Sequence, residues 1–401
     1  MNLKSFALIV ASACMLSVNS FAQKKKAPKQ EEPQGYVFTT VVENPVTSIK
    51  NQSSSGTCWC FSALSFFESE IMRAGGPELD LSEMFVVSHA YADKAEKYVR
   101  LHGNLNFGGG SSFGDALYVM KHYGMVPNSE MVGMNYGTDI HVHGELDAVT
   151  KSYVSTIVKN PNRKLSTAWK KGFQGILDAY LGEIPEKFTV DGKEYTPKSY
   201  AESLNLNPDN YISFTSFSHQ PFYEEFSIEV RDNWRNTLSY NIPMEEMIEV
   251  MDYAIENGYT VGWTSDMSEK SWNEKGLATV PDVEANREAG SDEARWIGAT
   301  REEQTAMLYN FNSPGKEKVI TQQMRQEAYD NKETTDDHAM HMYGIAKDQN
   351  GTKYYMIKNS WGEFGDYKGH NYISEAYVKY KTMNILVNKA AVPAHILNKL
   401  K

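Results

Sequence analysis

Cys58 stands in a setting that favours reaction over packing. The chain runs Gly56-Thr57-Cys58-Trp59 into apolar residues with helical spacing, which places the thiol at the predicted start of a helix. The partial positive charge at that end stabilises a thiolate, the nucleophilic form of cysteine. Gln52 can fold back so that its amide donates to an oxygen under attack, and the backbone N–H of Cys58 supplies a second donor. These residues predict a nucleophile with an oxyanion hole.

A base, and a group that orients it, occur near the other end of the chain. His338 can take the proton of Cys58 and pair with the thiolate as an imidazolium. The side-chain carbonyl of Asn359 can accept a hydrogen bond from the other ring nitrogen. We expect Trp361 to shield this Asn359–His338 bond from water. A triad of Cys58, His338 and Asn359 is therefore predicted.

Other histidines compete for the role of base. A strand would turn His341 to the face opposite His338, and His370 lies in a predicted turn beyond Asn359. His141 and His143 could ligate a metal, but two ligands without a third nearby are more typical of a solvated strand. We therefore keep His338 as the base and predict no metal and no cofactor.

Three short runs carry a resemblance to a known family: Gln-x5-Cys-Trp, Asp-His-Ala-Met and Asn-Ser-Trp-Gly, beginning at residues 52, 337 and 359. Together they resemble the papain-like cysteine peptidases, and in detail the bleomycin hydrolase/aminopeptidase C subfamily. Similar runs occur at residues 81–85, 108–111 and 123–127. The resemblance implies an aminopeptidase acting on peptides, possessing the triad above. It also implies a substrate-binding set of Gly109, Gly110 and Trp361, in which the glycine backbone would bind an extended peptide.

The resemblance implies an α+β papain-like fold of two lobes, a helical left lobe and an antiparallel, barrel-like sheet in the right lobe. The separation of Cys58 from His338 is about twice the roughly 130–150 residues of the papain signature, which indicates a large, mostly helical insertion. We predict these segments: signal peptide 1–22, disordered tether 23–35, left lobe 36–131, insertion 132–242, and right lobe 243–401 with a shortened C-terminal arm.

The N-terminal sequence and the net charge limit where the protein is located and which partners it binds. A lysine, an apolar run and Ser-x-Ala before residue 23 predict export to a bacterial periplasm or beyond, with lipoprotein processing at Cys14 as the alternative. The apolar run is too short for a stable membrane span. A net charge of −11 argues against nucleic-acid binding. The resemblance implies a homohexamer.

Exopeptidase and endopeptidase activity are both open at this level. In the family resembled here, a C-terminal arm lies in the cleft and its carboxylate meets the amino group of the substrate. That tail is not found after residue 389, which predicts a more open cleft and, as the alternative, endopeptidase activity. Glu68, Asp266 and Asp337 could recognise an amine or serve the structure. A third hypothesis is a catalytically silent peptide-binding protein.

Overall fold

The computed structural model describes residues 35–162, 164–289 and 300–401. The predicted signal peptide, Cys14, and all of the tether except its last residue lie outside this part of the chain. Within it, no helix is both long and apolar enough to cross a membrane.

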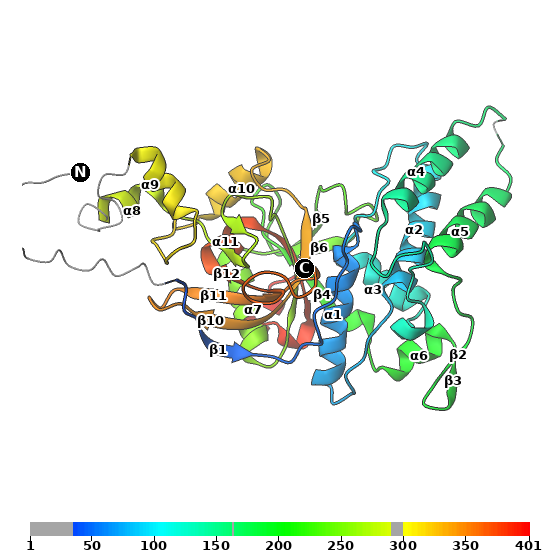
Figure 1. Cartoon of the computed structure of the whole chain (residues 1–401), viewed down its shortest axis with the longest axis horizontal. Coiled ribbons are helices and arrows are strands. Elements are labelled where there is room, and N and C mark those ends of the chain that lie inside the picture. Colours follow the sequence, from blue (N-terminus) through cyan, green and yellow to red (C-terminus); the bar gives the residue numbers. More distant parts are fainter. Residues whose placement is uncertain (1–34, 163, 290–299) are drawn as a thin grey trace, which may run out of the picture.

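The first lobe is helical and is built around α1 (Cys58–Arg73), of which residues 59–71 are buried. Apolar side chains cover this helix on nearly every side, as expected for a helix at the centre of a lobe. The helices α2 and α3 pack against it, and α4, α5 and α6 extend the same apolar core (Figure 1). Their bounds are Glu83–Arg100, Phe113–His122, Gly144–Val158, Ala168–Leu181 and Pro197–Ser203, and a hairpin of β2 (Phe188–Val190) and β3 (Lys193–Tyr195) precedes α6.

The second lobe is a sheet of eleven strands in the described part of the chain, in the order β5-β6-β4-β13-β7-β10-β11-β12-β9-β8, with β1 also pairing to β10. The bounds are β1 Thr39–Glu43, β4 Tyr211–Thr215, β5 Glu225–Ser227, β6 Leu238–Asn241, β7 Val261–Ser265, β8 Trp272–Asn273, β9 Leu277–Ala278, β10 His338–Lys347, β11 Lys353–Lys358, β12 His370–Ser374 and β13 Thr382–Asn388. The pairing is antiparallel apart from β12 with β9 and β4 with β6. The sheet is thus largely but not wholly antiparallel.

Helices of the second lobe surround the sheet. The longest is α7 (Met244–Glu256), whose apolar side chains form one core with the central strands. The others are α8 (Val283–Ala289), α9 (Arg301–Leu308), α10 (Gln322–Asp330), α11 (Glu375–Lys381) and α12 (Ala394–Leu397). In Figure 1, α8 and α9 lie at the end of the molecule farthest from α4 and α5.

The segment 132–242 is shared between the lobes. Its helices α4 to α6 join the helical core, whereas β4, β5 and β6 add three strands to the sheet beside β13. The sequence predicted a mostly helical insertion here, whereas strand pairing with β13, more than a hundred residues later, depends on the fold as a whole. The segment therefore fastens the two lobes together.

The lobes meet where α1 packs against β10. In this interface Ser65 of α1 lies 2.9 Å from Nδ1 of His341 on β10. Lys50, which precedes α1, pairs with buried Glu68 at 2.8 Å and with Glu83 at 3.2 Å. These contacts hold the start of α1 in a fixed position relative to the start of β10.

Candidate active site

His338 and Asn359 are brought together by neighbouring strands. His338 is the first residue of β10 and Asn359 directly follows β11, the adjacent antiparallel strand. Nε2 of His338 lies 2.8 Å from Oδ1 of Asn359, and both residues are about 5% exposed. Because the amide oxygen can only accept, Nε2 carries the proton and Nδ1 is left with its lone pair.

Cys58 reaches the same place from the other lobe. It is the first residue of α1, so its N–H belongs to the helix end that has no partner within the helix. Cys58 as a whole residue is partly exposed, and its thiol lies against the backbone of Ala339, the residue after His338. The structure thus places the thiol at the histidine end of β10.

Burial sets the charge state of the two groups. It raises the pKa of the Cys58 thiol to about 12, the charges of Asp336 and Asp232 add to this rise, and the backbone of Ala339 and Trp59 opposes it. Burial also lowers the pKa of His338 to about 4, against a smaller opposite effect of its bond to Asn359. Either charge alone is therefore disfavoured.

Gln52 is fixed by hydrogen bonds on both ends of its amide. Its Oε1 accepts from Oγ of Ser360 at 2.6 Å, and its Nε2 donates to the carbonyl of Ser55 at 2.8 Å. Its backbone N–H also donates to the carbonyl of Ser360 at 2.7 Å. Since an amide nitrogen carries two protons, one N–H of Gln52 remains to donate elsewhere. Ser360 was not singled out by the sequence, although it lies between two residues that were.

Trp361 packs on the imidazole. Its ring centroid lies 4.9 Å from that of His338, with the planes tilted by 31°. The indole thus covers the ring that is bonded to Asn359, as the sequence led us to expect.

The glycine loop approaches α1 closely. A Cβ on Gly109 would lie 2.9 Å from Oη of Tyr91 and 3.0 Å from Cα of Gly56, so a side chain here would force its neighbours to shift. The carbonyl of Gly109 accepts from Nε1 of Trp59 at 3.0 Å. The buried ammonium of Lys94 donates to the carbonyls of Gly108, at 3.0 Å, and Gly110, at 2.6 Å. The loop is therefore pinned next to the thiol.

The rival residues lie elsewhere. His341 is fully buried against Ser65, and His370 bonds to Tyr343. The expectation of a solvated strand at His141 and His143 is wrong, because His143 is 0% and His141 9% exposed. Their backbone pairs with Ser54 in the loop before Cys58, and this long-range pairing buries them. Cys60, two residues after Cys58, is 0% exposed.

The acidic residues named from the sequence have structural partners. Glu68 holds Lys50, as described above. Asp266 accepts from the backbone N–H groups of Ser268 and Thr335, and Asp337 accepts from those of Met267 and Ser268. Two carboxylates that the sequence did not single out, Asp232 and Asp336, are instead the ones whose charges reach Cys58.

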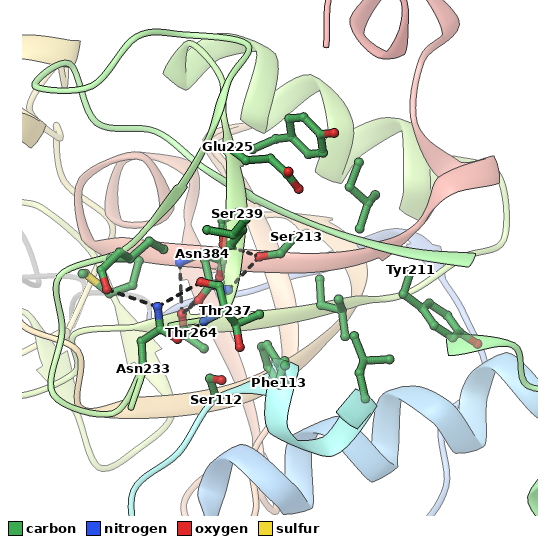
Figure 2. A pocket seen from close by; sticks show the side chains of 18 of the residues that line it. Ser112, Phe113, Tyr211, Ser213, Glu225, Asn233, Thr237, Ser239, Thr264 and Asn384 are labelled. Atoms are coloured by element: carbon green, nitrogen blue, oxygen red, sulfur yellow. Dashed lines mark hydrogen bonds between the residues drawn. The ribbon is translucent and has the colours of Figure 1, made fainter. Parts of the chain in front are cut away.

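A cavity of about 460 Å³ has Asp336 in its lining. Ser112 and Phe113, just after the glycine loop, line one side, and Asp336 lies two residues before His338 on another. Figure 2 shows Ser213 and Asn384 facing each other across strands on its wall, 2.9 Å apart. Its size suits a substrate side chain.

Two family models match the stretches that carry this site. Residues 38–142, which contain Gln52, Cys58 and the glycine loop, match the Papain family cysteine protease model. Residues 290–401, which contain His338 and Asn359, match the Peptidase C1-like family model. The chain belongs to the papain-like cysteine peptidases. The prediction of an enzyme that is a cysteine peptidase is confirmed.

Relatives of this papain-like peptidase are found over most of its length. Aminopeptidase C of Lactobacillus delbrueckii subsp. lactis is 23% identical over 411 residues, covering 89% of this chain and 83% of the relative. Aminopeptidase C of Streptococcus thermophilus is 22% identical, with 94% and 88% covered. Aminopeptidase C of Listeria monocytogenes is 21% identical, with 85% and 80% covered.

A solved structure bears out the fold. PepW from Lactobacillus rhamnosis HN001 superposes with a TM-score of 0.66 at 19% identity, covering 90% of this chain and 84% of that one. The predicted α+β fold with a helical lobe and a sheet lobe is confirmed.

Proposed function

We propose that this papain-like peptidase is a cysteine aminopeptidase that uses Cys58 as nucleophile and His338 as base. The observation that carries the proposal is the 2.8 Å bond between Nε2 of His338 and Oδ1 of Asn359, which directs Nδ1 away from the asparagine while the thiol lies at Ala339. Three relatives named aminopeptidase C, each matched over four-fifths or more of its own length, support the proposal of an exopeptidase.

The chemistry is acyl transfer in two halves. Nδ1 of His338 takes the proton from Cys58 as the sulfur attacks the peptide carbonyl. The free N–H of Gln52 and the backbone N–H of Cys58 donate to the oxyanion, and the imidazolium then protonates the departing amine. Water, deprotonated by His338, releases the first amino acid from the thioester and restores the thiol.

Supporting residues keep these groups in place. Asn359 orients the imidazole, Trp361 excludes water from that bond, and Ser360 holds Gln52. Gly109 and Gly110 offer backbone to the substrate, and for Trp361 the ring contact favours a positioning role over the substrate contact expected at first.

The test is hydrolysis of aminoacyl aminocoumarin amides by the mature protein, alongside labelling with a thiol-reactive epoxide. We expect turnover, labelling at Cys58, and loss of both in Cys58→Ala, whereas Cys60→Ala, which alters a buried core thiol, keeps both. Labelling without turnover of free or N-blocked substrates would support the silent peptide-binding protein instead. Turnover of N-blocked peptides alone would support the endopeptidase.

Export and assembly belong to the same proposal. The sequence of residues 1–22 supports secretion to a bacterial periplasm or beyond, and family resemblance supports a homohexamer. Cell fractionation with N-terminal sequencing of the mature protein tests the first, and light scattering after size exclusion tests the second.

A further inference from the structure

The chain between β5 and β6 reaches from the sheet lobe over the glycine loop. The side chain of Asp232 in this connection lies so close to Gly110 that a Cβ built there would be 2.0 Å from Oδ2. In a papain-like peptidase this is the loop along which the substrate backbone would run beyond its first residue. The carboxylate therefore occupies space that a longer substrate would need.

The connection is fixed to the helical lobe just after Asp232. Trp234 donates from Nε1 to Oγ of Ser111 at 2.6 Å. Arg235 pairs with Asp115 at 2.7 Å and with Asp93 at 3.1 Å. With these anchors immediately after it in the chain, Asp232 is held in the groove by the fold.

The carboxylate of Asp232 has no hydrogen bond or ion pair among the described residues, although little of it is exposed. Lys94, the cation with the largest effect on the pKa of Asp232, donates its hydrogen bonds to the carbonyls of Gly108 and Gly110 instead. Asp336 likewise lacks such a partner within this part of the chain. Burial raises the pKa of Asp232, and the charge of Lys94 opposes that rise, while burial and the charge of Asp232 raise the pKa of Asp336 to about 8. Lys94 offsets this effect only in part, so a cation bound at the two carboxylates would stabilise their charged forms.

We propose that Asp232 binds the α-ammonium group of the substrate and, by its position on Gly110, ends the groove beyond the first residue. The inference deepens the proposed aminopeptidase function and rests on it. Asp336, beside it, contributes a second negative charge. The substrate class is therefore peptides with a free, protonated N-terminus, recognised by a side chain of the segment 132–242.

The decisive comparison uses Asp232→Asn, which keeps the shape and removes the charge. The control is Glu229→Gln, which removes a charge from the same connection at a side chain that is 71% exposed. Each protein is assayed on leucyl aminocoumarin amide and on its N-acetylated form, with active sites counted by epoxide titration. Asp232→Asn loses a charge-assisted hydrogen bond to the substrate ammonium group. Its kcat/KM on the free-amine substrate should therefore fall about ten- to hundredfold, mainly through a higher KM.

Asp232→Asn should cleave the acetylated substrate at the same residual rate as the unmodified protein. Glu229→Gln should have the kcat/KM of the unmodified protein on both the free and the acetylated substrate. An equal loss on both substrates, or no change on either while the free amine is still cleaved, would overturn the inference and leave the aminopeptidase function intact. Failure of the unmodified protein to cleave any free-amine substrate would overturn the proposed function itself.

Two further measurements do not depend on how Asp232→Asn folds. In the unmodified protein, kcat/KM should fall above about pH 8, as the α-amine of the substrate loses its proton, and a hydroxyl analogue should bind weakly at every pH. Asp232→Gly should open the groove and raise cleavage of N-acetylated dipeptide amides at least tenfold. If Asp232→Gly shows no rise in cleavage of N-acetylated dipeptide amides, although epoxide titration finds all of its active sites intact, the side chain of Asp232 does not end the groove.

Discussion

Gln52 offers the sharpest test of the site, because its role as an oxyanion donor can be separated from its role as a structural link. Replacing it with alanine removes the Nε2 donor and leaves Oγ of Ser360 and the carbonyl of Ser55 without their partners. Gln52 is only 5% exposed, so water does not readily replace the lost bonds.

Both losses have expected magnitudes. Removing one oxyanion donor costs about 2.7–4 kcal/mol in the transition state, or about 10²–10³ in kcat. Each buried group left unpaired costs about 1–3 kcal/mol of folding stability. We therefore expect Gln52→Ala to lose at least about a hundredfold in kcat with little change in KM, and to unfold at a lower denaturant concentration.

Alkylation of Cys58 by iodoacetamide distinguishes the two roles, since this displacement forms no tetrahedral oxyanion. In Gln52→Ala the alkylation rate should change less than about threefold while amide hydrolysis falls at least about a hundredfold. Asn51→Ala is the matched control, because that exposed side chain only accepts from the N–H of Ser53. A parallel fall in alkylation and hydrolysis would refute the oxyanion role and show that Gln52 merely holds the thiol in place.

Four further predictions follow from the same geometry. Asn359→Ala removes the acceptor at Nε2 of His338 and should lower kcat about ten- to hundredfold, with the ring free to rotate; unchanged kcat would contradict the orienting role. The pKa of His338 is lowered to about 4, below its unfolded value of about 6.5. The contribution of this group to stability is therefore present above pH 6.5 and is lost as the pH falls from 6.5 to 4. Urea unfolding should show a fall in the free energy of unfolding across that pH range, and the fall should be smaller in His338→Gln. Asp336→Asn removes a charge that raises the pKa of Cys58, so the midpoint of the pH–alkylation curve should shift to lower pH, and a shift to higher pH would contradict it. Lys50→Met leaves buried carboxylates unpaired and should destabilise the protein by about 3–5 kcal/mol in urea unfolding, whereas Lys187→Met, on an exposed pair, should leave the urea midpoint nearly unchanged.

The sequence by itself determined the parts of this protein that depend on local chemistry. The helix at Cys58 and the strand beginning at His338 follow from side-chain spacing, which acts between residues a few positions apart. The large separation of Cys58 from His338 likewise predicted a mostly helical insertion between them. Family resemblance added the pairing of these distant stretches, and the matches to papain-type models support the same enzyme class.

Only the tertiary structure decided which groups surround the thiol. Ser360 meets Gln52 across 308 positions of the chain, and β4 to β6 join a sheet whose partner strand is β13. Asp232 reaches Gly110 because anchors on Trp234 and Arg235 fix its connection to the other lobe. Such contacts depend on how the lobes close on each other, and an aspartate in a polar loop has the same sequence pattern whether it faces solvent or a catalytic groove.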